Sequence, residues 1–207
     1  HDRLSGPNVI ATLTSPHPFT TARLTALRET PDPRIAALPA PRASVLLGGP
    51  SGAHAFPPGD LERMARAVAA IASQGHSVMA TPSRRTPPAL IEAVRTGLAG
   101  ADPTRVFLWD GAGDNPYGHM LAHADAILVT GDSVNMIGEA VSTGAPVFIF
   151  APSGGGGRIG DFIAALEQAG AVRRFDGRLS RFAYEPIDSS AAIAKAIAGR
   201  FEAMDHR

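Results

Sequence analysis

The sequence contains no cysteine, which excludes disulfide bonds, thiolate catalysis and cysteine-based zinc or iron–sulfur sites. It also lacks net charge, because 19 basic side chains balance 19 acidic ones. The overall charge therefore does not favour nucleic acid or an anionic membrane as a partner. No apolar run approaches the roughly 20 residues that span a bilayer, and the first residues do not resemble a signal peptide. We expect a cytoplasmic protein without a membrane span.

Short apolar runs after residue 42 alternate with stretches of helical pattern. Runs of this length are consistent with buried parallel strands. Strands that alternate with helices of ten to fifteen residues are typical of βαβ units with right-handed crossovers. The sequence therefore predicts an α/β fold with a doubly wound, mainly parallel, Rossmann-like sheet. The predicted strands are ASVLLGG (43–49), HSVMAT (76–81), TRVFLWD (104–110), AILVTG (126–131), VFIF (147–150) and AVRRF (171–175).

The helix after the first strand has recognisable boundaries. Asp60 is a good N-cap, and Gly75 ends a helix predicted over residues 61–73. Prolines open the next helix, over residues 87–100, and a glycine closes it.

The first 42 residues follow a different pattern. Residues 9–13 fit a short strand, a helical segment extends to Leu27, and residues 31–42 are proline-rich and without a period. The chain begins at His1 rather than at Met, which we interpret as a chain whose front is missing or was trimmed. We expect residues 31–42 to be a linker or a covering segment and residues 43–207 to form the Rossmann-like domain.

In an open α/β sheet the ligand lies beyond the carboxyl ends of the strands, so the loops that follow the strands are considered together. The loop after the first strand is GGPSG (48–52). Its glycines let backbone N–H groups approach an anion closely. The spacing is neither that of a nucleoside-triphosphate loop nor that of a dinucleotide fingerprint, and a plain tight turn is the alternative.

Two adjacent arginines follow the second strand. Arg84 and Arg85 lie in TPSRRT (81–86), next to Ser83. Guanidinium forks match phosphate oxygens, so this loop could clamp a diphosphate. A solvated pair of charges is the alternative.

The loop after the third strand contains the single tryptophan, Trp109. Its ring could pack against a nucleobase or close the core. Asp110 and Asp114 do not form a calcium-loop pattern, and we predict a turn with Asn115 as a helix cap.

The segment VTGDSVNMIGEAVSTGAPVFIF (129–150) has the pattern of a strand, a polar turn, a short helix and a second strand. Either Asp132 or Ser133 can cap the helix, which leaves backbone donors and the positive end of the helix dipole facing a ligand. Asn135 and Glu139 are four residues apart and share the face that turns away from the sheet. A carboxylate on ribose hydroxyls beside a pyrophosphate would hold a nucleoside diphosphate. A glutamate on a solvated face is the alternative.

Four histidines could contribute to a site. His119 and His123 have the i, i+4 spacing of a zinc pair, but no third ligand is evident, and we predict no bound metal. His17 and His54 could reach the cleft, although the sequence identifies no partner for either. The GGGG loop (154–157) is predicted to be a lid, with a tight pass over the site as the alternative.

Several motifs in combination resemble known families. The order GGPSG, HADAILVTGDSVNMIGEAVSTGAPVFIF and GRIGDFIAALEQAGAV is similar to the C-terminal half of GT-B glycosyltransferases, in which a strand-Ser-helix-Glu-Gly-Pro unit binds the sugar nucleotide. More closely, SRRT, DNPY, TGDSVNM and EAVSTGAPV resemble the mitochondrial-fission ELM-type family, whose bacterial members are often labelled nucleoside-diphosphate-sugar epimerases. The resemblance extends from His1 to about Val172.

The resemblance implies a fold of the GT-B C-terminal-domain type and a set of binding residues. It also implies that residues 1–42 are the tail of a lost N-terminal domain followed by a linker. Catalytic bases of inverting GT-B enzymes usually lie in that other domain, so no catalytic residue is assigned. The implied contacts are Gly49, Ser51 and Gly52 with phosphate, Ser83, Arg84 and Arg85 in the same cleft, Ser133, Asn135 and Met136 with the diphosphate, and Glu139 with the ribose.

Our first hypothesis is a GT-B-type glycosyltransferase, or its donor-binding half, which takes a nucleoside-diphosphate sugar and an unknown acceptor. We expect no cofactor and no metal, because Arg84, Arg85 and the helix N-terminus could neutralise the diphosphate. A nucleotide-sugar epimerase of the same fold is the first alternative. The second is a non-catalytic interaction module that has kept the fold.

Overall fold

The computed structural model describes residues 5–6 and 8–205, and of residues 202–205 the backbone only. Over this part of the chain six strands form one sheet in the order β3-β2-β1-β4-β5-β6, and each neighbouring pair is parallel. The chain runs outward from β1 to β3 and then returns to the other side of β1 with β4. This is the doubly wound order, so the predicted fold class is confirmed. The strands are β1 (Arg42–Leu47), β2 (Ser77–Pro82), β3 (Val106–Leu108), β4 (Ala126–Thr130), β5 (Val147–Phe150) and β6 (Val172–Arg174).

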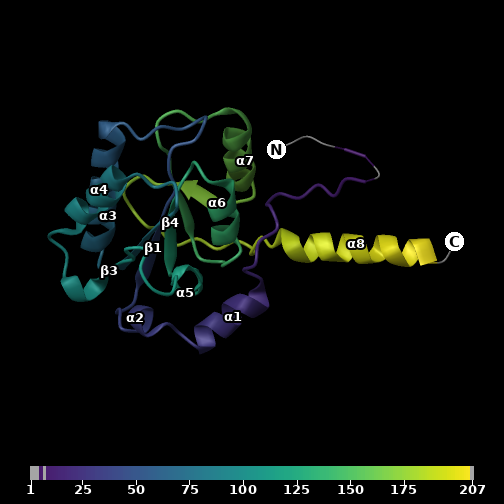
Figure 1. The fold of residues 1–207 in the computed structure, drawn as a ribbon, viewed down its shortest axis with the longest axis horizontal. Helices are drawn as coiled ribbons and strands as arrows, with labels where there is room; N and C mark the ends of the chain where they lie inside the picture. Colours follow the sequence, from purple (N-terminus) through teal and green to yellow (C-terminus); the bar gives the residue numbers. More distant parts are fainter. Residues whose placement is uncertain (1–4, 7, 206–207) are drawn as a thin grey trace.

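The helices lie on both faces of this sheet (Figure 1). Proline opens α3 and α4, since its fixed φ suits the first turn and its missing N–H has no partner to lose there. The helices are α1 (Thr21–Glu29), α2 (Pro33–Ala36), α3 (Pro58–Ser73), α4 (Pro88–Leu98), α5 (Tyr117–Ala122), α6 (Val134–Val141), α7 (Gly157–Gln168) and α8 (Ser189–Asp205), with a 3₁₀ turn at Pro103–Arg105.

The two largest apolar cores hold the layers together. One lies between the sheet and α1, α5, α6 and α7, and the other lies between the sheet and α3 and α4. Along β1, Leu46 faces the first core while Val45 and Leu47 face the second. Both faces of the strand are therefore buried, which explains why its sequence is apolar throughout rather than alternating.

Two local predictions were wrong, the strand over residues 9–13 and Asp60 as an N-cap. Residues 9–13 form no strand, because this segment has no strand of the sheet to pair with. The helix after β1 begins at Pro58, so Asp60 lies in its first turn instead of at the N-cap. There its buried carboxylate accepts the backbone N–H of Ser153 and pairs with Arg63. The segment 31–42 includes the short helix α2, whose Ile35 is fully buried.

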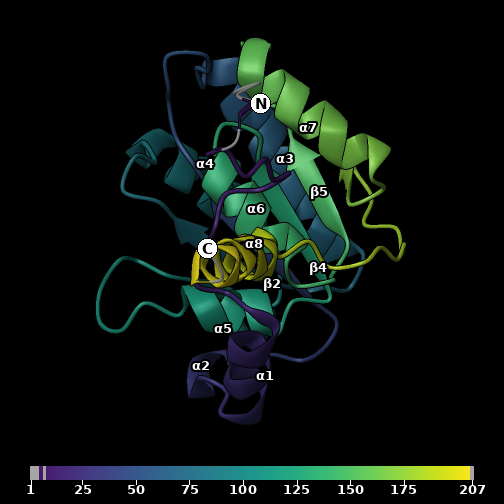
Figure 2. The ribbon, with the colours of Figure 1, turned by 90° about the vertical axis from the view of Figure 1, so that its right-hand side faces the viewer.

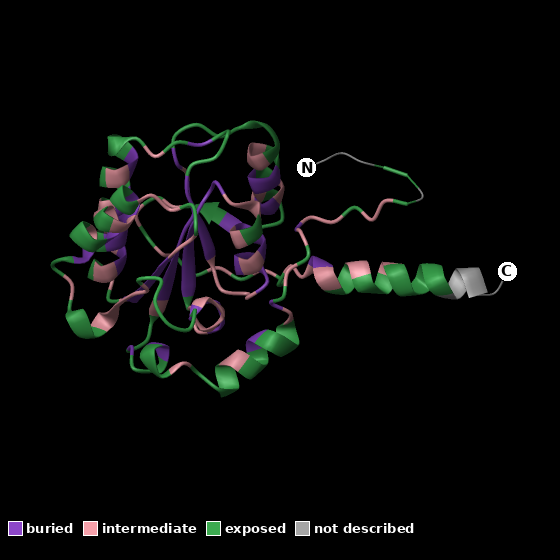
Figure 3. Cartoon of the chain, viewed as in Figure 1, coloured by how far each residue is buried: buried purple, intermediate pink, exposed green. Residues whose placement is uncertain are grey.

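The segment around α1 packs on the same domain as the strands. Phe19 and Leu24 belong to the core that contains α6 and α7. Figure 1 shows α8 projecting from the body of the domain, with the N-terminal segment on the same side, and Figure 2 views this helix end-on. Most of α8 is exposed (Figure 3), including Ile197 and Phe201, of which 43% and 65% of the surface is accessible. No helix in the described part of the chain is long and apolar enough to cross a membrane.

Candidate functional site

A cleft of about 460 Å³ opens at the carboxyl edge of the sheet. The loops after β2 and β3 and the beginnings of α5 and α6 form its walls, which is where open α/β sheets hold ligands. Four of the predicted binding residues line it: Ser83, Arg84, Asn115 and Met136. Its other lining residues are Thr81, Pro82, Trp109, Gly111 and Tyr117.

Hydrogen bonds fix the aromatic wall of this cleft. The indole N–H of Trp109 donates to the carbonyl of Ala112 at 3.0 Å, and the Asn115 side chain accepts the backbone N–H of Tyr117 at 3.0 Å. Asn115 thus caps the start of α5 one residue before the assigned N-cap position, Pro116. The indole ring is held at the wall of the cleft, where a planar ligand could stack on it.

Arg84 is the unpaired charge of the cleft. Its side chain is exposed, and no hydrogen bond or ion pair joins it to another residue in the part of the chain that the structure describes. An unpaired guanidinium at a cleft wall is available to a phosphate or a carboxylate.

Arg85, the next residue, is engaged within the protein. Its guanidinium donates to the carbonyls of Gly49 and Pro50 at 3.1 and 3.0 Å, and to Oδ2 of Asp132 at 3.1 Å. The Asp132 side chain is completely buried, while that of Arg85 remains 46% exposed. Asp132 also accepts the N–H of Gly49 at 2.9 Å. Neither Arg85 nor Asp132 lines the cleft, so the structure gives both of them a supporting role beside it.

The glycine turn after β1 is packed too tightly for a side chain. A Cβ at Gly48 would lie 2.2 Å from Oδ2 of Asp132, and a Cβ at Gly49 would lie 2.0 Å from the carbonyl oxygen of Arg85. Both distances are far below van der Waals contact. These two glycines therefore let the loops after β1, β2 and β4 meet.

The amides of this turn are used within the protein and do not form an open nest. Gly48 donates to the Thr130 hydroxyl, Gly49 to Asp132, and Ser51 to the carbonyl of His54. Gly52 has open space around its Cα. In this arrangement the predicted phosphate residues Gly49 and Ser51 stabilise the turn, and they lie outside the cleft.

The GGGG loop, predicted to be a lid or a tight pass over the site, is bonded to the turn after β1 and does not line the cleft. His54 and Gly154 form an isolated antiparallel bridge, and the N–H of Gly155 donates to the carbonyl of Ala53 at 2.6 Å. Nδ1 of His54 lies 3.2 Å from the Ser51 hydroxyl. The glycines keep the loop against the turn, because a Cβ at Gly154 would lie 2.4 Å from the Ala53 carbonyl oxygen.

Helix α6 carries the remaining predicted residues. Ser133, and not Asp132, is its N-cap, and its hydroxyl accepts from Met136 N. Ile137 and Val141 are buried against the sheet and Asn135 is exposed, as the helical pattern predicts. Glu139 is half-buried rather than solvated, and its carboxylate accepts the hydroxyl of Tyr117.

Burial shifts the acid–base properties of this pair. It raises the pKa of Glu139 above its usual value, and the Tyr117 hydrogen bond and the nearby His17 act against that shift. Burial and the Glu139 charge raise the pKa of Tyr117 well above its usual value, so the phenol remains the donor. Sequence reasoning did not select Tyr117. Its signals were its position at the start of the helix that follows the β3 loop and its place at the end of the DNPY motif (114–117).

His119 and His123 contact the N-terminal helices. Nδ1 of His119 accepts the backbone N–H of Asp32 at 3.3 Å, and Nε2 of His123 lies 3.1 Å from the Leu27 carbonyl. Burial lowers the pKa of His123. Among the described residues, no group of three or more His, Cys, Asp or Glu side chains is placed to hold a metal ion.

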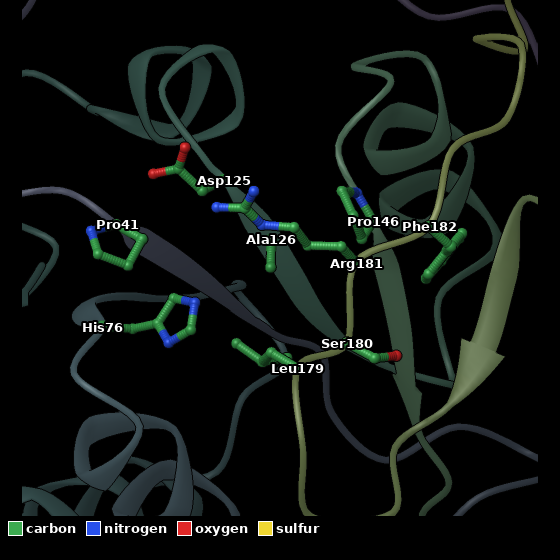
Figure 4. Close-up of a pocket in the computed structure, with 9 residues that line it drawn as sticks. All are labelled: Pro41, His76, Asp125, Ala126, Pro146, Leu179, Ser180, Arg181 and Phe182. Carbon is green, nitrogen blue, oxygen red and sulfur yellow. The ribbon is translucent and has the colours of Figure 1, made fainter.

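A second hollow, of about 500 Å³, lies at the opposite edge of the sheet. Pro41, His76, Asp125 and Pro146 each stand one residue before a strand, so this hollow is at the amino ends of the strands (Figure 4). Burial lowers the pKa of His76, and Asp125 acts against that shift. Ligands of doubly wound sheets lie at the carboxyl edge, and the cleft with Arg84 is therefore the candidate site.

Comparisons with known proteins identify the family. Residues 1–201 match the family described as Mitochondrial fission ELM1. The chain belongs to this family. It is 31% identical to the Mitochondrial fission protein ELM1 of Arabidopsis thaliana over 166 residues, which cover 79% of this chain and 38% of that protein. It is also 31% identical to the Uncharacterized protein RP120 of Rickettsia prowazekii (strain Madrid E) over 123 residues, 56% of this chain and 34% of that protein. The matches thus span less than two fifths of either relative.

Solved structures show more distant likenesses. The UDP-GlcNAc 2-epimerase from Neisseria meningitidis bound to UDP-GlcNAc has a TM-score of 0.46 at 13% identity, over 89% of this chain and 44% of that chain. The putative UDP-N-acetylglucosamine 2-epimerase from Listeria monocytogenes has a TM-score of 0.47 at 15% identity, over 91% and 60% of the two chains. Likenesses at this level carry no argument about activity. The family prediction is confirmed by the ELM1 matches.

Proposed function

We propose that this chain binds a nucleoside-diphosphate sugar at the carboxyl edge of its sheet, as the donor-binding half of a GT-B-type glycosyltransferase. The observation that carries the proposal is the unpaired guanidinium of Arg84 on the wall of a cleft that also contains Trp109. A cation and an aromatic plane in one cleft suit a phosphate and a base, respectively.

The proposal assigns the parts of the ligand to separate groups. Arg84 and the amino end of α6, where Met136 reaches the cleft, would neutralise the diphosphate without a metal. Trp109 would stack on the base. Glu139 is not among the residues that line the cleft, and it would accept ribose hydroxyls beside the Tyr117 hydroxyl that it already accepts. Arg85 is left out of the ligand contacts, because Asp132 and two carbonyls already hold its guanidinium.

Calorimetric titration of the chain with UDP, GDP, ADP, CMP and inorganic pyrophosphate tests the proposal. We expect at least one nucleoside diphosphate to bind, and pyrophosphate to bind more weakly because it lacks the base and the ribose. If none of the nucleotides binds, the proposal fails and the interaction module becomes the better interpretation. Binding alone does not separate glycosyl transfer from epimerisation, since both hypotheses use the same nucleotide pocket.

A further inference from the structure

The hollow at the amino edge of the sheet has the features of a second ligand site. Its volume of about 500 Å³ falls within the range of sites that bind small molecules, and apolar residues with a few polar groups among them are the usual lining of such sites. None of its lining residues also lines the cleft with Arg84. A ligand in this hollow would therefore be additional to the nucleotide.

The floor of the hollow is fixed by the sheet. The carbonyl of Pro41 accepts the N–H of Ser77 at 2.8 Å, and the N–H of Asp125 donates to the carbonyl of Arg42 at 2.8 Å. The Asp125 side chain is held as well, because its Oδ2 accepts the N–H of Arg42 at 2.7 Å. The carboxylate is thus in position before a ligand arrives, and its Oδ1 remains open.

The irregular segment that follows β6 forms the opposite wall. The N–H of Leu179 donates to the Gln74 side chain at 3.0 Å, and the Phe182 ring packs edge-on against Phe148, with centroids 5.6 Å apart. These contacts anchor the backbone on both sides of Arg181. The wall therefore presents two apolar side chains, those of Leu179 and Phe182, with a cation between them.

Arg181 and Asp125 are the oppositely charged groups of the lining. In the part of the chain that the structure describes, no hydrogen bond or ion pair joins the Arg181 side chain to another residue, and no cation pairs with Asp125. Figure 4 shows the Arg181 side chain extending across the hollow in the direction of Asp125. Burial lowers the pKa of His76, so its ring adds a neutral polar group rather than a second cation.

We propose that this hollow binds an α-amino acid with an apolar side chain. The carboxylate of the ligand pairs with Arg181 and its ammonium group with Oδ1 of Asp125, so that each charge of the zwitterion meets an opposite charge. The ligand side chain lies against Leu179 and Phe182, which removes apolar surface from water. A simple anion would face the like charge of Asp125, and a simple cation that of Arg181. The pair of protein charges therefore selects a zwitterion.

Calorimetric titration of the parent chain with amino acids and matched analogues tests the proposal. The amino acids are L-leucine and L-phenylalanine. Isocaproate and hydrocinnamate lack the ammonium group, and isoamylamine and phenethylamine lack the carboxylate. We expect saturable binding of at least one amino acid, and binding of its two analogues that is roughly tenfold or more weaker. The proposal is overturned if neither amino acid binds, or if an analogue binds as tightly as its amino acid.

Two substitutions test the assigned charges. Arg181→Gln and Asp125→Asn should each weaken binding of the amino acid roughly tenfold or more, and the asparagine keeps an oxygen for the Arg42 N–H. Arg178→Gln and Glu185→Gln are the matched controls, because these exposed residues lie outside the hollow and should leave binding unchanged. Equal losses in the controls would mean that only net charge matters, which overturns the proposal. If a variant does not fold, as judged by circular dichroism, the analogue series in the parent chain decides.

A crossed experiment separates this site from the proposed nucleotide site. Arg84→Ala should leave amino acid binding unchanged, and Arg181→Gln should leave UDP binding unchanged. If the amino acid binds but no nucleotide does, the proposed function fails and the second site stands. If UDP binds but neither amino acid does, the second site fails and the proposed function stands. A loss of amino acid binding in Arg84→Ala would place the amino acid in the cleft and overturn the assignment to this hollow.

Discussion

Arg84 and Arg85 are neighbours in the sequence, yet their side chains lie in two different regions of the carboxyl edge. The closed side consists of Gly48, Gly49, Arg85 and Asp132. Its N–H and guanidinium donors bond within the protein, while Oδ1 of Asp132 is buried without a partner among the described residues. On the open side, which is the cleft, Arg84 has no partner among the residues that the structure describes. A charge that the protein has already paired contributes to stability, and an unpaired charge at a cleft is available to a ligand.

The comparison shows that the number of polar residues in a loop does not locate a binding site. The closed side contains glycines, an arginine and an aspartate, which is the composition expected of a phosphate site, but its donors are used internally. The cleft is better identified by its cation, Arg84, which remains unbonded among the described residues. Substitutions on the closed side should therefore change the free energy of unfolding, and substitutions in the cleft should change binding.

Gly49→Ala should have the largest effect. The new Cβ would lie 2.0 Å from the Arg85 carbonyl oxygen, and since the backbone fixes the positions of both atoms, neither can rotate away. Overpacking of this kind typically costs 1–3 kcal/mol, and we expect a loss of about 3 kcal/mol in the free energy of unfolding, measured with urea. Gly52→Ala is the control, because a Cβ there meets nothing within 4 Å. Equal losses in the two variants would show that the closed side is not tightly packed.

Breaking the ion pair between Arg85 and Asp132 should cause the next largest loss in the free energy of unfolding. Asp132→Asn keeps one acceptor but removes the charge from a buried carboxylate that bonds Gly49 and Arg85. We expect a loss of about 1.5–3 kcal/mol in the free energy of unfolding. The double variant with Arg85→Ala should lose less than the sum of the single losses, since the two groups are in contact. Arg84→Ala should change stability by less than about 0.5 kcal/mol, and additive losses at Asp132 and Arg85 would contradict the pairing.

The layout of the sheet was predictable because it depends on local sequence pattern. Apolar runs such as residues 126–131 and 147–150 specify buried strands, and the alternation with helices specifies a parallel sheet. The strand predicted over residues 9–13 was wrong because pattern alone does not show whether a partner strand exists. Asp60 was misassigned because Pro57 and Pro58 already start the helix.

The site was less predictable, because the partners of its polar groups are distant in the sequence. The partner of Arg85 is Asp132, 47 residues away, and that of the Gly48 amide is Thr130, 82 residues away. No local sequence pattern shows which of the two arginines, Arg84 or Arg85, is bonded within the folded protein. Tyr117 was missed for the same reason, since its partner Glu139 is 22 residues further along the chain.

Arg84→Ala tests the open side, and it should lower the affinity for a ligand that contains a diphosphate. The loss of one charge-assisted contact typically costs about 1.5–3 kcal/mol, which is roughly ten- to a hundredfold in affinity. The decrease should be similar for UDP and for pyrophosphate, because Arg84 would contact the diphosphate whatever the base. Calorimetry measures both. The control is Arg95→Ala, an exposed arginine of α4 that lies outside the cleft, and a similar decrease in that variant would mean that Arg84 acts only through the net charge.

The smallest effect is expected at Trp109. Its indole is fixed at the cleft wall by a bond to Ala112, and a stacked base would lose its platform in Trp109→Leu. Stacking of a base on an aromatic side chain contributes about 1–3 kcal/mol in single-stranded nucleic acid complexes. We expect the lower end, a roughly fivefold loss for UDP and no loss for pyrophosphate, with Trp109→Phe in between. Since Trp109 is the single tryptophan, its fluorescence reports on the cleft directly. UDP should change the emission of the parent chain more than pyrophosphate does, and an equal change with both ligands would show that the base does not stack on the indole.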